Sequence, residues 1–104
     1  MNVAETILAQ LGGNKFRAMT GAKSFVGGSD LLQFDLPRGF AANKATKVRI
    51  TLDVSDTYTM AFYQWNAKKL DMKQLSEIPG VYADDIRRIF TSETGLDCTL
   101  GRAA

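Results

Sequence analysis

Two neighbouring segments of the sequence place cations and large aromatic side chains in a regular pattern. Residues 47–53 and 57–65 alternate apolar with polar, charged or aromatic residues. This period of two is typical of a strand with one face in the core and the other in solvent. The residues expected on the buried face are Val48, Ile50, Leu52, Tyr58, Met60 and Phe62. Lys47, Arg49 and Thr51 are then expected on the solvent face.

The solvent face of these strands combines the side chains that nucleic-acid recognition uses. Nucleobases stack on exposed aromatic rings, while lysine and arginine bind phosphates. A further strand, expected at residues 15–20, adds two cations. The candidate binding residues on this face are Lys15, Arg17, Lys47, Arg49, Tyr63 and Trp65. The same pattern is also typical of a solvated sheet face, or of aromatic rings covered by the C-terminal tail or by a second subunit. A net charge of +2 is low for a nucleic-acid-binding protein.

A glycine-rich segment at residues 21–29 predicts a flexible loop. Residues 20–24 resemble the end of a phosphate-binding P-loop, but that motif needs glycine directly before lysine, and Ala22 intervenes here. Lys23 and Phe25 are therefore candidate loop contacts to a partner, without a nucleotide site. The apolar residues Phe25, Val26 and Phe40 form either a recognition tip or a lid over a small core.

Catalytic and metal-binding chemistry has little support in this sequence. There is no histidine, and Cys98 is the only cysteine, so the usual catalytic triad, an intramolecular disulfide and a cysteine-based zinc site are excluded. Asp53 and Asp56 flank a turn, while Asp84 and Asp85 open a helix. Both settings favour aspartate for structural reasons. We therefore expect a protein that is not an enzyme and that uses no metal or cofactor.

The remaining periodicity outlines the elements that must position these side chains. A helix is expected at residues 3–11, capped by Asn2, and a second from residue 84 to the glycine at position 95. A turn is expected at Pro79 and Gly80. In the last strand, Leu70 and Met72 are expected to face inward. The strands are expected at residues 15–20, 31–36, 47–53, 57–65 and 68–73, and residues 96–104 form a tail.

Short links between successive strands favour antiparallel pairing. We predict an α+β fold, an antiparallel four- to five-stranded β-meander flanked by an N-terminal and a C-terminal helix in two layers. A length of 104 residues, 45% of them hydrophobic, fits a single domain over residues 1–104. The N-terminus lacks signal-peptide features, and no apolar run reaches membrane-spanning length. We therefore expect a cytoplasmic protein that does not engage a membrane.

Several short strings together resemble a group of small uncharacterised proteins from bacteriophages, prophages and other mobile elements. They are LGGNKF at residues 11–16, MTGAK at 19–23, VRITL at 48–52, SDTY at 55–58 and GVYAD at 80–84. The similarity extends from about Leu11 to Leu96. It implies a small accessory protein that acts inside a bacterial cell by binding host or phage macromolecules. No catalytic or ligand residue is implied by it.

Two functions of different classes are compatible with these observations. The first is an accessory protein that binds nucleic acid, or a nucleic-acid-handling complex, through the basic and aromatic sheet face. The alternative is a protein-binding modulator of a host factor, or a homodimerising structural module, that uses the same face or the loop at residues 21–29. The partner is accordingly nucleic acid, a host or phage protein, or a second copy of the chain. Salt dependence separates these functions, because phosphate contacts release counterions and weaken steeply as ionic strength rises.

Overall fold

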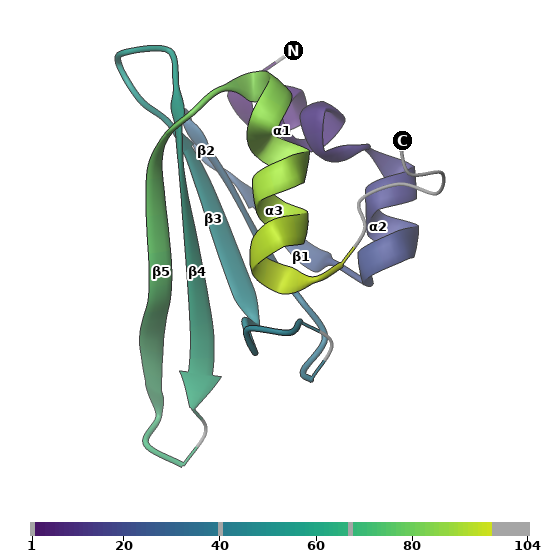
Figure 1. Ribbon diagram of the computed structural model, residues 1–104, viewed down its shortest axis with the longest axis vertical. Helices are drawn as coiled ribbons and strands as arrows, with labels where there is room; N and C mark the ends of the chain where they lie inside the picture. The colour runs from purple at the N-terminus through teal and green to yellow at the C-terminus, as the bar shows by residue number, and fades with distance from the viewer. Residues whose placement is uncertain (1, 40, 67, 97–104) are drawn as a thin grey trace.

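The computed structural model describes residues 2–39, 41–66 and 68–96, and helices cover one face of its five-stranded antiparallel sheet (Figure 1). The strands lie side by side in sequence order: β1 (Lys23–Gly27), β2 (Leu31–Asp35), β3 (Lys47–Leu52), β4 (Tyr58–Asn66) and β5 (Asp71–Val81). The helical layer comprises α1 (Val3–Leu11), α2 (Asn14–Thr20), the 3₁₀ helix η1 (Ala83–Asp85) and α3 (Ile86–Thr94). The predicted α+β meander, with helices before and after the sheet, is confirmed.

Helix α1 begins and ends at the predicted signals. The Asn2 side chain accepts a hydrogen bond from the Glu5 backbone N–H at 2.8 Å, which satisfies one of the amides left unpaired in the first turn. Gly12 follows the last turn with a φ of 127°, a conformation that glycine adopts without steric cost. The side chains buried on one face of α1 are Ala4, Ile7 and Leu11. They hold the helix against β1 and β2.

The strand predicted at residues 15–20 is wrong, because this segment forms helix α2. Phe16 and Thr20 are four residues apart and are both buried, which is the spacing of one helical face. The Phe16 ring packs edge-to-face on Phe34 and Phe90, each at a centroid distance of 5.2 Å for Phe16. Ala18, which a strand would have placed in the core with Phe16, is exposed. The burial of Phe16 among the core rings therefore decides the helical conformation.

The flexible loop predicted at residues 21–29 is also wrong in part, because it contains strand β1. This edge strand pairs with β2, with a register shift between Lys23 and Val26. Gly27 is required for packing, because a Cβ placed there would lie 2.7 Å from the Ala4 Cβ. Glycine at this position thus allows α1 to approach β1. Phe25 is partly buried and its ring lies 5.4 Å from that of Phe34, as expected of a lid over the core.

The central strands have the predicted register. Val48 lies opposite Phe62, and Ile50 lies opposite Met60. These four side chains are completely buried, whereas Arg49 is exposed. The other inward residues follow the prediction with one qualification, since Leu52 at the strand end is only partly buried. Lys47 and Thr51 differ from expectation and are half-buried, because each is flanked by residues of both β2 and β4.

Strand β5 differs most from the prediction. In place of a short strand at residues 68–73, it extends from Asp71 to Val81 and passes through Pro79 and Gly80, where a turn was expected. Proline is tolerated because β5 is an edge strand, and Gly80, with a φ of 68°, lies where the register against β4 shifts. Leu70 does not face inward and is 77% exposed, while Met72 is half-buried.

Three predictions lie outside the described residues: those for Phe40, for Cys98 and for the tail beyond residue 96. Within the described ranges, no helix combines the length and the apolar character needed to cross a membrane.

Candidate functional site

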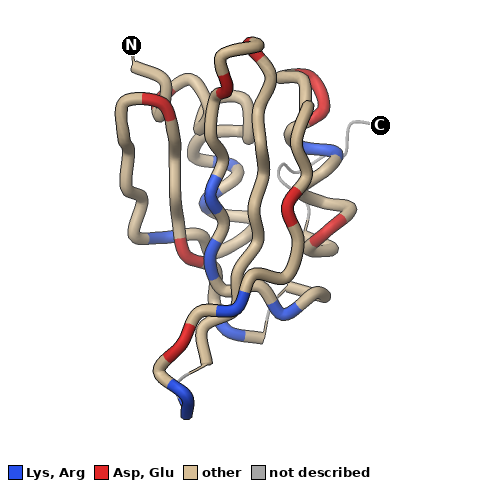
Figure 2. The backbone as a smooth tube through the Cα atoms, turned by 90° about the vertical axis from the view of Figure 1, so that its left-hand side faces the viewer, with Lys and Arg blue, Asp and Glu red and all other residues tan. Residues whose placement is uncertain are grey.

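The helices leave the other face of the sheet uncovered, and Figure 2 turns this face toward the viewer. We call it the open face. Its residues follow from the strand registers, since side chains directly opposite one another on neighbouring strands point to the same side. The residues at its centre are Gln33, Asp35, Lys47, Arg49, Ala61 and Tyr63.

Arg49 is held in place across three strands. Its Nε donates a hydrogen bond to the Gln33 Oε1 on β2 at 3.1 Å. On the other side, its guanidinium carbon lies 5.6 Å from the centroid of the Tyr63 ring on β4. The residue directly opposite on β4 is Ala61, whose small side chain leaves room for this arrangement. Arg49 therefore presents an exposed, oriented cation beside an aromatic ring, as the sequence pattern predicts.

Trp65 lies at the lower end of the open face, where β4 extends past β3. Its side chain is 45% exposed. The backbone around it is anchored to the connection that precedes β3. The Trp65 N–H donates to the Thr46 Oγ1 at 2.9 Å, and the Thr46 N–H donates to the Tyr63 carbonyl at 2.8 Å. Met72 lies opposite Trp65 on β5. The indole is thus fixed by two neighbouring segments while much of its surface stays open to solvent.

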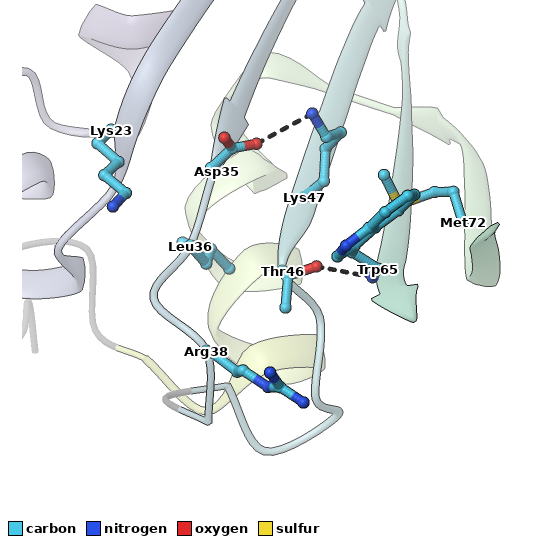
Figure 3. Close-up of a pocket in the computed structure, with 8 residues that line it drawn as sticks. All are labelled: Lys23, Asp35, Leu36, Arg38, Thr46, Lys47, Trp65 and Met72. Carbon is cyan, nitrogen blue, oxygen red and sulfur yellow. Dashed lines mark hydrogen bonds and ion pairs between the residues drawn. The ribbon is translucent and has the colours of Figure 1, made fainter. Parts of the chain in front are cut away.

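Two adjoining hollows surround Trp65, and we call them together the Trp65 groove. The larger has a volume of 410 Å³ and is shown in Figure 3, where Trp65 and Met72 lie on one side and Lys23 on the other. Its lining residues are Lys23, Asp35, Leu36, Arg38, Thr46, Lys47, Trp65 and Met72. The smaller, of 240 Å³, is lined by Arg38, Gln64, Trp65, Asn66 and Lys68. Because Arg38 and Trp65 line both hollows, the two form a continuous track.

The charge of the groove is positive. Lys23, Arg38, Lys47 and Lys68 line it, against a single carboxylate, Asp35, among its described lining residues. The Lys47 Nζ lies 3.1 Å from the Asp35 Oδ1 (Figure 3), so this lysine is partly neutralised. In the described part of the chain, no ion pair is formed by Lys23 or Arg38. Two cations are therefore available to an anionic ligand beside the indole.

Charge is segregated between the two ends of the sheet (Figure 2). The end that holds the β1–β2 and β3–β4 turns carries Asp30, Asp53 and Asp56. The opposite end, with the β2–β3 connection and the β4–β5 turn, carries mostly cations. Those cations are Lys23, Arg38, Lys44, Lys47, Lys68 and Lys69. This asymmetry is invisible in a net charge of +2, because the acidic end offsets the basic one.

The structure corrects part of the predicted site. Lys15 and Arg17 belong to α2 in the helical layer and do not share the open face. The Arg17 guanidinium carbon lies 4.5 Å from the centroid of the Phe25 ring, so this pair covers the helical side of the sheet. Of the two predicted loop contacts, Lys23 lines the groove, whereas Phe25 does not.

Lys47, Arg49, Tyr63 and Trp65 do lie on one face, as predicted. Arg38 was missed because it follows Pro37 in a connection without periodicity, where no pattern indicates a side-chain direction. Lys68 and Met72 were missed because the last strand was placed too early. A signal for Arg38 and Lys68 existed only in their type, as cations in turns next to strands with binding residues.

The acidic pairs considered for catalysis have local structural partners. The Asp53 Oδ2 accepts a hydrogen bond from the Thr59 hydroxyl at 2.7 Å. The Asp85 Oδ1 lies 3.5 Å from an Arg88 guanidinium nitrogen one turn later. Across the described ranges, no three histidine, cysteine, aspartate or glutamate side chains are grouped so that they could hold a metal ion.

No protein-family model, no curated protein and no solved structure matches this chain.

Proposed function

We propose that this protein binds single-stranded nucleic acid, with bases stacked on Trp65 in the groove and the phosphate backbone following the basic end of the open face. The observation that carries the proposal is a half-exposed tryptophan on a continuous track lined by four cations. Aromatic platforms beside cationic grooves are the usual means of binding single strands without reading a long sequence.

Stacking is supported by the way Trp65 is held. Its backbone is bonded to Thr46, and Met72 lies opposite it on β5, so the ring is positioned before a ligand arrives. A base that stacks on a positioned ring loses less free energy to ordering of the protein. A hollow of 410 Å³ beside the ring leaves space for a nucleobase and its sugar.

Phosphate binding is supported by Lys23 and Arg38. Both line the groove without an ion-pair partner among the described residues. Arg49, on the same face, extends the cationic surface along β3 toward the centre of the sheet. The acidic turns at the far end repel a polyanion, so the charge asymmetry orients an approaching strand toward the groove.

The proposal describes binding, without catalysis. The resemblance to small phage and prophage proteins adds the cellular context of an accessory protein that acts on nucleic acid, or on a complex that handles it, inside a bacterial cell. That context rests on the short sequence strings given above and on no other observation.

The intrinsic fluorescence of Trp65 tests the proposal directly, because it is the only tryptophan in the chain. Titration with unlabelled single-stranded oligonucleotides is expected to quench its emission, since a stacked base contacts the ring itself. The apparent affinity should fall steeply as salt is raised. Tyr82→Ala removes another exposed aromatic ring, at the acidic end, and is the matched control that should leave the titration unchanged. Absence of quenching and of oligonucleotide binding at low salt would reject nucleic acid in favour of a protein partner.

A further inference from the structure

The β4–β5 hairpin extends beyond the rest of the sheet. The last residue pair between β3 and β4 is Lys47 with Tyr63, whereas β4 and β5 continue to pair as far as Asn66 with Asp71. Figure 1 shows the hairpin projecting past the end of β3. Trp65 and Met72 form a cross-strand pair on this projecting part. The hairpin therefore carries one wall of the Trp65 groove out to its tip.

The tip presents one apolar side chain in an unfavourable backbone conformation. Leu70 is 77% exposed and has a φ of 51°, in the left-handed region that bulky residues rarely adopt. The Asn66 Oδ1 accepts hydrogen bonds from the backbone N–H groups of Lys68 and Lys69, at 3.0 and 3.1 Å. These bonds order the turn that precedes Leu70. An ordered turn that exposes leucine where glycine would be easier points to a contact made by the side chain.

The residues around Leu70 favour a polyanion over a protein surface. Lys68, Lys69 and Lys73 are exposed on the tip and on the strand that leaves it, and Asp71 is the acidic residue among them. The Asp71 carboxylate accepts a hydrogen bond from the Met72 backbone N–H at 2.8 Å. One apolar side chain is also far too small a patch for a stable protein interface. Proteins that contact duplexes use this combination of cations with an inserted apolar side chain.

The tip adjoins the groove, since Lys68 lines its smaller hollow together with Trp65. From this continuity we infer that the preferred ligand is a junction between double-stranded and single-stranded nucleic acid. The unpaired strand occupies the groove, Leu70 contacts the last base pair of the duplex, and Lys68 and Lys69 contact its phosphates. This inference rests on the proposed function of the Trp65 groove and adds the class of ligand.

Three labelled probes of matched sequence test the inference by fluorescence anisotropy: a single strand, a blunt duplex, and a duplex with a single-stranded overhang. The wild-type protein is expected to bind the overhang probe about tenfold more tightly than the single strand, because a second contact is added on one ligand. Leu70→Gly suits the left-handed backbone, so the fold is retained, and it should abolish this preference while single-strand affinity stays unchanged. Val54→Gly removes another exposed apolar side chain, in the β3–β4 turn, and is the control that should keep the preference.

Failure of the inference and failure of the proposed function have different results. If wild type binds the single strand and the overhang probe equally, or if Leu70→Gly keeps the preference, the junction inference is overturned while binding in the groove stands. If wild type binds none of the three probes at low salt, the proposed function is rejected and the inference falls with it.

Discussion

The Lys47 ammonium lies 3.1 Å from the Asp35 carboxylate, across β2 and β3 and directly beside the groove that holds Trp65. Asp35 is the acidic member of the described groove lining, so it occupies a cation that a phosphate would otherwise bind. An ion pair this close to solvent adds little to folding stability. Its main consequence is therefore for ligand binding.

Replacement of Asp35 by asparagine should increase affinity for single-stranded oligonucleotides. The change frees Lys47, so the slope of log affinity against log salt should steepen by about one unit. Fluorescence anisotropy at several salt concentrations measures both quantities. Asp53→Asn removes a carboxylate at the acidic end of the sheet and serves as the control. An Asp35→Asn protein with unchanged affinity and slope would place the phosphates away from Lys47.

Arg49→Ala and Trp65→Ala should both weaken single-strand binding, but in different ways. Loss of Arg49 removes a phosphate contact and should lower the magnitude of the salt slope by about one unit. Loss of Trp65 removes stacking worth about 1–3 kcal/mol and should leave the slope nearly unchanged. Lys15→Ala, on α2 in the helical layer, is the cation control. If Lys15→Ala weakens binding as much as Arg49→Ala, the ligand does not use the open face.

Truncation of the central core should be costly. Ile50 and Phe62 are completely buried on adjacent strands, so Ile50→Ala and Phe62→Ala should each lower the free energy of unfolding by about 2–5 kcal/mol. A domain of this size has about 5–15 kcal/mol in total. Urea denaturation followed by circular dichroism measures the change. Losses below about 1 kcal/mol at both sites would contradict the core assignment.

The contact between Gly27 and Ala4 can be tested by compensation. Gly27→Ala places a Cβ 2.7 Å from the Ala4 Cβ, so α1 must shift from β1, at a cost of about 1–3 kcal/mol. Ala4→Gly in the same chain removes the clash and should recover part of that stability, beyond the sum of the two single changes. A double variant whose unfolding free energy is the simple sum would mean that α1 does not approach β1 in this way.

The backbone of Leu70 predicts a small effect on stability. Leu70→Gly relieves left-handed strain of about 1–2 kcal/mol, but glycine also gains about 0.5–1 kcal/mol of freedom in the unfolded chain. The two terms nearly cancel, so the melting temperature should be equal to that of wild type or slightly higher. A clear drop in melting temperature would show that the Leu70 side chain stabilises the hairpin, which its 77% exposure argues against.

Local sequence patterns were sufficient for the elements whose residues alternate or repeat without interruption. The caps of α1, the register of β3 against β4, and the shared face of Arg49, Tyr63 and Trp65 all follow from spacing alone. Spacing is informative there because a strand buried on one face allows a single register, and a slip by one residue would expose every core side chain.

Tertiary packing decided the segments with weak or mixed patterns. Phe16 fits a strand as well as a helix by its neighbours, and only its contacts with Phe34 and Phe90 place it on α2, which takes Lys15 and Arg17 out of the site. Arg38 and Lys68 enter the site because the β2–β3 connection and the β4–β5 turn meet at one end of the sheet. Residues far apart along the chain share no local periodicity, so the groove around Trp65 arises only when the folded sheet brings those connections together.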